Sequence, residues 1–252
     1  GQYIHSCLLL LEKEKGYDLS KTTVGLVGVG HVGHAVIEAI RPLGVQILLN
    51  DPPQKEALRK AGKPHEFFLK MEELQEKCDI ISFHTPLITK GPYPTFHLAN
   101  KIFFNALKKQ PIIINTSRGA VVDNTDVLQA LKDGIIRDAI IDTWENEPNI
   151  NQELLNLIYI GTPHIAGYSA DGKANATRMA LTALCNHFHL PVTFQIRVPQ
   201  LPEEELPESN LTETERALVL YNPHTDSLKL KSHPTMFEEL RGNYPLRREF
   251  IE

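Results

Sequence analysis

The chain has 252 residues, of which 42% are hydrophobic and 23% are charged, and its formal net charge is −5. This composition is ordinary for a globular protein and provides enough apolar material for one substantial core with an appendage. The lysines and arginines are scattered along the chain and create no basic field for a nucleic-acid backbone. We therefore expect no nucleic-acid partner.

The apolar runs and the cysteines further limit the class of protein to which the chain can belong. The longest apolar run, Cys7 to Leu11, is far shorter than the roughly 18–20 residues that a membrane span needs. No basic and apolar leader is visible, so we expect a cytoplasmic protein without a membrane partner. Cys7, Cys78 and Cys185 form no C-x-x-C pair, which argues against a disulfide framework or a zinc site. We expect all three to be buried as small hydrophobic residues.

The first predicted element is a helix over Tyr3–Lys15, with Ile4, Leu8 and Leu11 on one apolar face. The chain enters this helix almost directly from Gly1, as the middle of a larger protein would. We therefore expect residues 1–20 to be a helix and lead-in that connect two domains.

From Thr22 onward, β-branched runs alternate with amphipathic stretches, which is typical of βαβ units. The expected strands are Val24–Val29, Val45–Asn50, Ile80–Phe83, Ile112–Asn115, Ile136–Ile141 and Leu157–Ile160. The expected helices between them are His31–Leu43, Lys55–Ala61, Met71–Glu76, Leu98–Leu107 and Asn124–Lys132. The pattern predicts an α/β fold, with a doubly wound parallel sheet of Rossmann type over residues 21–190 that includes a returning helix at Ala170–His189.

The composition changes after the returning helix. Residues 191–210 contain several prolines and the run Glu203-Glu204-Glu205, which is typical of a solvated linker. Beyond it we expect helices at Thr212–Tyr221 and Thr235–Arg241, and a strand that begins near Arg248 and continues to the last residue. The segment 211–252 is too small to bury a core alone. It must therefore dock on the main domain or on a second copy of the chain.

A glycine turn lies where the first expected strand meets the next helix. Gly28, Gly30 and Gly33 have the G-x-G-x-x-G spacing, which allows a tight turn and a close approach of the backbone to a pyrophosphate. The helix N-terminus that follows, with His31 and Val32, presents free N–H groups to the same phosphates. Without an acidic residue at the end of the next strand, this motif is weak evidence for dinucleotide binding. The glycines could then serve only a tight turn.

Asp51 strengthens this interpretation because it ends the next expected strand. A carboxylate at this position accepts hydrogen bonds from the adenosine ribose and repels a 2′-phosphate, so we predict NAD rather than NADP as cofactor. The alternative role for Asp51 is a helix or turn cap.

Polar residues also follow the later expected strands, and such residues meet at the carboxyl edge of a parallel sheet. A histidine held by a glutamate gains basicity and a fixed orientation, and an arginine grips a carboxylate through two parallel N–H bonds. Arg118, Glu147 and His164 therefore suit the oxidation of a hydroxy acid, with His164 taking the hydroxyl proton. Arg118 could instead be a surface arginine, His164 a hydrogen-bonded turn residue, and Glu147 with Pro148 the start of a solvated helix. His187, His189 and Asp171 lack ligand spacing, so we expect no metal.

Longer strings around these residues resemble the D-isomer-specific 2-hydroxyacid dehydrogenases. They are Gly-Leu-Val-Gly-Val-Gly-His-Val-Gly, His-Thr-Pro-Leu, Ile-Asn-Thr-Ser-Arg-Gly-Ala-Val-Val-Asp, Ile-Asp-Thr-Trp-Glu-Asn-Glu-Pro and Thr-Pro-His-Ile-Ala-Gly-Tyr-Ser. Gly91–Thr95, His164–Lys173 and Asn243–Phe250 narrow the resemblance to a branch that oxidises a phosphorylated 2-hydroxy acid in pyridoxal phosphate synthesis. The resemblance extends over essentially the whole chain.

The resemblance implies a role for each matched position. Arg118, Glu147 and His164 would form the catalytic set, and Tyr168 would join Arg118 in binding the substrate. Asp142 would contact the nicotinamide amide. The remaining NAD contacts would come from Asp51, Thr85, Thr116, Ser117 and Gly167. The family's C-terminal α+β segment is a dimerisation domain, so we expect a homodimer.

The resemblance also implies parts that this chain lacks. Members of the family have a small substrate-binding portion before the helix that begins here near Gly1, and their C-terminal domain continues further. We therefore expect a fragment with little activity of its own. Two alternatives remain open, namely another D-2-hydroxyacid dehydrogenase, such as one for phosphoglycerate, and an NAD-binding regulatory protein without turnover.

Overall fold

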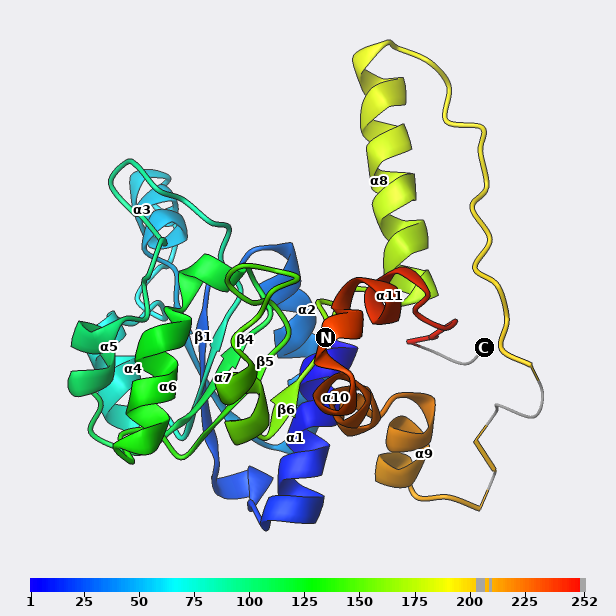
Figure 1. The fold of residues 1–252 in the computed structure, drawn as a ribbon. Coiled ribbons are helices and arrows are strands. Elements are labelled where there is room, and N and C mark those ends of the chain that lie inside the picture. The colour runs from blue at the N-terminus through cyan, green and yellow to red at the C-terminus, as the bar shows by residue number, and fades with distance from the viewer. Residues whose placement is uncertain (203–206, 209, 250–252) are drawn as a thin grey trace.

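The computed structural model describes residues 1–202, 207–208 and 210–249, and its centre is a parallel sheet (Figure 1). The sheet has six strands in the order β2-β1-β3-β4-β5-β6. The strands are β1 (Thr23–Val27), β2 (Gln46–Asn50), β3 (Ile80–Phe83), β4 (Ile112–Asn115), β5 (Asp138–Ile141) and β6 (Ile160–Gly161). Because β2 and β3 lie on opposite sides of β1, the chain reverses its winding direction there, and ligands bind at such points.

Helices cover both faces of the sheet, so most strand residues are buried on either side. One face packs against α1 (Gln2–Lys15) and α2 (His31–Ile40), and Leu26 and Ile112 belong to that core. The other face packs against α4 (Met71–Lys77), α5 (Lys101–Asn105), α6 (Asn124–Lys132) and α7 (Gln152–Leu157). Helix α3 (Pro52–Lys60) follows β2 and begins at the Asp51 cap.

The predicted doubly wound parallel sheet is confirmed, and several bounds need correction. Leu157 ends α7 rather than beginning a strand, and the last strand is Ile160–Gly161. The expected helix at Leu98–Leu107 is confined to α5, because Asn100 caps its N-terminus with two hydrogen bonds. The helix expected from Lys55 starts earlier, because Pro52 suits the first turn after a capping aspartate.

The C-terminal segment packs on the main domain. Helix α9 (Glu213–Leu220) contacts α1, and α10 (Pro223–Ser232), which was not predicted, contacts both α1 and the β6 edge. Within this contact the Ser227 hydroxyl accepts a 2.9 Å hydrogen bond from the backbone N–H of Gly161. Helix α11 (Phe237–Gly242) follows, and Phe237 is fully buried. Docking on the main domain, one of the two expected arrangements, is therefore observed within a single chain.

Helix α8 (Ala170–His187) projects away from the sheet (Figure 1). Leu184 on this helix is 51% exposed and is not packed in a core. Residues 188–202 have no regular secondary structure, as expected for a linker. The predicted acidic linker run Glu203-Glu204-Glu205 lies outside the described residues, and so does most of the strand expected after Arg248.

Cys7 and Cys78 are buried as expected, whereas Cys185 on α8 is only partly buried. Burial raises the pKa of the Cys78 thiol to about 12, which keeps it protonated and unreactive. Within the described ranges, no helix is long and apolar enough to cross a membrane. In the same residues, no group of three or more His, Cys, Asp or Glu side chains could hold a metal ion.

Candidate cofactor and active site

The glycine turn joins β1 to α2 and has the geometry that its spacing predicts. Gly28 has a φ of +89°, and a Cβ there would lie 2.8 Å from the carbonyl oxygen of His84. A Cβ on Gly33 would overlap the carbonyl oxygen of Gly28. Gly30 differs, because no atom lies within 4 Å of the position that a Cβ would take there. Two glycines are thus required by packing, while the third leaves open space at the N-terminus of α2.

Asp51 lies across from this turn at the end of β2. Its Oδ2 accepts a hydrogen bond from the backbone N–H of Val29 at 2.8 Å, and its Oδ1 caps α3 through the N–H of Gln54 at 2.9 Å. The alternative role as a helix cap is therefore observed. It does not exclude ribose binding, because two carboxylate oxygens offer about four acceptor positions.

A cavity of about 890 Å³ opens between the glycine turn, Asp51 and the segment 84–98. Its lining includes Gly28, Gly30, Asp51 and Thr85, and its far wall is proline-rich with Pro92 and Pro94. The hydroxyl of Thr85 is buried there without a hydrogen-bond partner in the described chain. An unpaired buried hydroxyl and open space at Gly30 fit a dinucleotide with polar groups along one edge.

His84 lines the same cavity, is 8% exposed and connects the ends of β3 and β4. Its Nε2 lies 2.9 Å from the hydroxyl of Ser82, and its Nδ1 lies 3.2 Å from the hydroxyl of Thr116. Burial lowers the pKa of His84 to about 3, so its ring is neutral at pH 7. The ring therefore joins Ser82 and Thr116 as a hydrogen-bonding element rather than as a charge.

Asp142 ends β5 and is 1% exposed. Its carboxylate accepts hydrogen bonds from the hydroxyl of Thr162 at 2.6 Å and from the backbone N–H groups of Ile165 and Ala166 at 2.8 and 3.0 Å. Burial raises the pKa of Asp142, while these donors oppose the rise. In this chain Asp142 thus holds the loop after β6, next to His164.

His164 and Glu147 form the pair that the sequence predicts. The Nδ1 of His164 lies 2.8 Å from Oε2 of Glu147, and Oε1 of Glu147 accepts the backbone N–H of Trp144 at 2.8 Å. His164 has a φ of +58°, a left-handed conformation that is costly for a residue with a Cβ. When Nδ1–H donates to Glu147, Nε2 is left as a free acceptor.

Arg118 is predicted to act with this pair, but it is not joined to it. Its guanidinium is exposed and donates a 2.6 Å hydrogen bond to the carbonyl of Ser117. Among the described contacts, none links Arg118 with Glu147 or His164. Ser117 in turn donates its hydroxyl to Oδ1 of Asn115 at 2.7 Å. Asn115, fully buried and not predicted as a site residue, also donates to the carbonyl of Arg118 at 3.1 Å and so shapes that loop.

Tyr168 lies in the same loop as His164 and is surrounded by cations. The Nζ of Lys173 lies 4.4 Å from its ring centroid, and the guanidinium carbon of Arg241 lies 5.8 Å from it. Tyr244 meets the Tyr168 ring edge to face at 6.1 Å. Gly167, beside it, is exposed. Lys173 of α8 and Arg241 of the C-terminal segment thus place positive charge beside the loop of His164.

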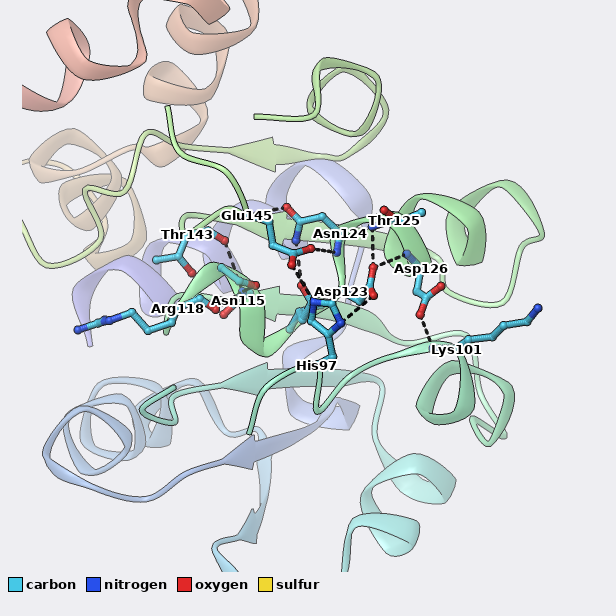
Figure 2. Close-up of polar contacts among 12 residues, drawn as sticks. His97, Lys101, Asn115, Arg118, Asp123, Asn124, Thr125, Asp126, Thr143 and Glu145 are labelled. Carbon is cyan, nitrogen blue, oxygen red and sulfur yellow. Dashed lines mark hydrogen bonds and ion pairs between the residues drawn. The ribbon is translucent and has the colours of Figure 1, made fainter. Parts of the chain in front are cut away.

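One further group was missed by sequence reasoning. Figure 2 shows His97 between two carboxylates, those of Asp123 and Glu145. Neither periodicity nor a short motif singles out His97, because its partners lie 26 and 48 positions away. Only the glutamate's place in Trp144-Glu145-Asn146-Glu147 indicates a link with the site.

The dinucleotide cavity at the reversal point of the sheet and the Glu147–His164 pair define a nicotinamide-dependent dehydrogenase domain. The model of the D-isomer specific 2-hydroxyacid dehydrogenase family, NAD binding domain, matches residues 10–166. The chain belongs to this family, whose domain binds NAD, and it is an oxidoreductase domain of that kind.

Relatives with known names agree with this assignment. Erythronate-4-phosphate dehydrogenase of Bacteroides fragilis is 51% identical over 249 residues, which cover 99% of this chain and 70% of the relative. The enzyme of the same name from Escherichia coli O157:H7 is 37% identical over 258 residues, covering 99% of this chain and 67% of the relative. D-mandelate dehydrogenase of Rhodotorula graminis has a similar structure, with a TM-score of 0.57 and 26% identity over 77% of this chain and 57% of that chain.

Proposed function

We propose that the chain carries the cofactor-binding and acid–base parts of an erythronate-4-phosphate dehydrogenase. The reaction would oxidise the 2-hydroxyl of 4-phospho-D-erythronate to a 2-oxo acid in pyridoxal 5′-phosphate synthesis. The observation that carries the proposal is the 2.8 Å pair of His164 and Glu147. It lies in a chain that is 51% identical to enzymes of this name.

His164 and Glu147 would manage the proton. With Nδ1–H donated to Glu147, Nε2 of His164 accepts the proton from the substrate hydroxyl, and Glu147 stabilises the imidazolium that results. Bound NAD would supply the acceptor for the hydride on the carbon that carries this hydroxyl. The proton and the hydride leave the substrate in the same oxidation, so the hydroxyl becomes a carbonyl.

The other predicted residues would bind and orient. Arg118 would release the carbonyl of Ser117 and hold the substrate carboxylate in two parallel hydrogen bonds. Gly28, Gly30, His31, Val32 and Gly33 would line the pyrophosphate, and Asp51 would accept the ribose hydroxyls. Thr85, Thr116, Ser117, Asp142 and Gly167 would surround the nicotinamide half.

We place the phosphate end of the substrate at Tyr168. The support for this is the positive charge of Lys173 and Arg241, 4.4 and 5.8 Å from the Tyr168 ring. An ammonium and a guanidinium suit a dianionic phosphate ester, because phosphate hydrogen bonds to charged donors are stronger than neutral ones.

Assembly and location are part of the same proposal. Large apolar side chains are exposed on α8 and just after it, where Met179, Phe188 and Leu190 are each more than half exposed. Exposed apolar groups of this kind favour an interface. We therefore propose a homodimer and a cytoplasmic enzyme, with residues 211–252 serving the dimer.

The test has a binding part and a turnover part. Calorimetry should find that this chain binds NADH more tightly than NADPH. Oxidation of 4-phosphoerythronate should be weak in this chain and should appear in a chain extended to the length of the relatives, while His164→Ala in the extended chain should abolish turnover and keep NADH affinity. Preference for 3-phosphoglycerate over 4-phosphoerythronate would contradict the substrate, and full turnover in His164→Ala would contradict the mechanism.

A further inference from the structure

His97 occupies an unusual position for a side chain outside the predicted site. Its Nδ1 lies 3.0 Å from Oδ2 of Asp123, and its Nε2 lies 2.7 Å from Oε1 of Glu145. Both ring nitrogens therefore face carboxylate oxygens (Figure 2). Only the protonated imidazolium has two donors, and that form also offsets the repulsion between the two carboxylates. We name His97, Asp123 and Glu145 the histidine clasp.

The backbone at His97 is held in a conformation that the residue alone would avoid. Its φ is +46°, and its N–H donates a 2.7 Å hydrogen bond to the carbonyl of Ala120. The ring also stacks on Phe96, with centroids 4.0 Å apart. A left-handed residue with a Cβ costs on the order of 1 kcal/mol and persists where its surroundings hold it, often near functional sites.

Each carboxylate of the clasp is also tied to backbone elsewhere. Oδ1 of Asp123 caps α6 through the N–H of Thr125 at 2.9 Å. Oε2 of Glu145 accepts the N–H of Asn124 at 2.9 Å, and the N–H of Glu145 donates to Oδ1 of Asn124 at 3.1 Å. Glu145 is thus fixed at its side chain and at its backbone, both on the same neighbouring segment.

This fixation lies two residues from the candidate acid–base pair. Glu147 accepts the N–H of Trp144 and holds His164, so residues 144–147 form one tight turn with the clasp on one side and His164 on the other. A Cβ on Gly119, next to Arg118, would overlap the carbonyl oxygen of Trp144. The turn therefore packs directly against the loop of Arg118.

We propose that His97 is a positioning residue for the oxidation: the histidine clasp fixes the 144–147 turn, and through it the orientation of Glu147 and His164. The inference rests on the proposed function for its kinetic consequence. Its structural consequence, a fixed Glu147–His164 hydrogen bond, does not depend on turnover. Small displacements matter at such pairs, since a shift of about 1 Å can cost on the order of 100-fold in rate.

The variants distinguish a positioning role of His97 from an effect of its charge and from a general loss of stability. His97→Ala removes the clasp. His97→Gln keeps most of the volume of the side chain and can still hydrogen-bond to one of the two carboxylates. Asp123→Asn keeps an oxygen for the α6 cap and can donate its amide to Nδ1 of a neutral His97, so the geometry is retained without the cation. His224→Ala is the matched control, because His224 forms a 3.0 Å ion pair with Glu14 and is similarly exposed, at 30% against 28% for His97.

The primary readout is the downfield proton NMR signal of the His164 Nδ1–H, assigned by its loss in His164→Ala. We expect this signal to be lost in His97→Ala and weakened in His97→Gln, and to persist in Asp123→Asn and His224→Ala. In the chain extended to the relatives' length, His97→Ala should lower kcat about 10-fold or more at unchanged KM for NAD, and Asp123→Asn should stay within about threefold.

The outcomes are distinct. Persistence of the His164 signal in a folded His97→Ala, or in His97→Gln if the alanine variant does not fold, overturns the proposal. Equal signal loss in His224→Ala also overturns it, because the effect would then be general loosening. If the unsubstituted extended chain lacks turnover while the NMR pattern holds, the proposed function fails and the positioning role stands.

Discussion

The cofactor half and the acid–base half of the site are built in opposite ways. At the glycine turn, the proposed binding of the dinucleotide would depend on the absence of side chains, because Gly28 and Gly33 have no room for a Cβ and Gly30 leaves open space. At the ends of β5 and β6, the proposed acid–base chemistry would depend on side chains held by hydrogen bonds, from Glu145 through the 144–147 turn to Glu147 and His164. Backbone shape governs the first half, and hydrogen-bond geometry governs the second.

Substitutions in the two halves should therefore have different effects. In the cofactor half, an added methyl group should change binding of the dinucleotide because it changes the path of the backbone. In the acid–base half, an isosteric change should leave binding intact and change turnover, because only proton transfer uses that geometry.

Glu147→Gln should give the largest change. The amide keeps the size of the side chain but cannot stabilise the His164 imidazolium, so turnover in the extended chain should fall about 100- to 1,000-fold. NADH affinity by calorimetry should change less than about twofold. Glu153→Gln on α7 is the control, since Glu153 forms an exposed ion pair with Lys132 and none of the described contacts joins it to the turn. A matching loss of NADH affinity in Glu147→Gln would remove the separation between the halves.

Gly33→Ala tests the cofactor half. Its Cβ would overlap the carbonyl oxygen of Gly28, so the turn must open, and we expect NADH affinity to fall about 100-fold with some loss of thermal stability. Gly30→Ala should weaken NADH without changing the melting temperature, because no atom lies within 4 Å of the added Cβ. Gly242→Ala, with equally open space in α11, should change neither property. Unchanged NADH binding in both turn variants would move the cofactor elsewhere.

The two halves of the site also differ in how much of their structure could be predicted from the sequence. The glycine spacing predicts the turn because φ and packing leave few other residues possible, and the Glu147–His164 pair was predicted from two strand ends. Asp142 was assigned to the nicotinamide through the family resemblance, yet its hydrogen bonds to Ile165 and Ala166 depend on backbone positions that only the folded loop defines. That assignment to the cofactor remains a prediction.

The features that the sequence did not predict were missed for similar physical reasons. Helix α10 begins with Asn222 as its cap and Pro223 in its first turn, a local signal that was present, but its apolar residues do not repeat strongly enough to predict a helix. The two-residue strand β6 is defined by its pairing with β5 rather than by its own composition. The histidine clasp depends on contacts between residues far apart in the chain, which a single sequence does not reveal.

His84 is buried in the lining of the cofactor cavity, and its titration offers a smaller effect of about 2 kcal/mol. Its pKa is lowered from 6.5 to about 3 by burial, so between those values the unfolded chain binds a proton that the folded chain excludes. The free energy of unfolding should therefore fall as the pH falls, by about 2 kcal/mol from pH 6.5 to pH 5 for this group. Urea unfolding of His84→Gln should lose that part of the pH dependence. The exposed control His187→Gln should keep it, and equal slopes in both variants would contradict the assignment.

Asp51→Ser should give the smallest change, because serine keeps the α3 cap while removing the negative charge near the ribose. We expect NADH affinity to fall about tenfold and NADPH affinity to rise relative to it, since a 2′-phosphate is no longer repelled. Asn151→Ser, the corresponding change at the α7 cap, controls for the stability effect of the cap. If Asp51→Ser lowers the melting temperature as Asn151→Ser does and leaves the ratio of NADH to NADPH affinity unchanged, Asp51 is only a cap. The cofactor half would then select its dinucleotide through the glycine turn and the proline-rich wall, by shape without charge.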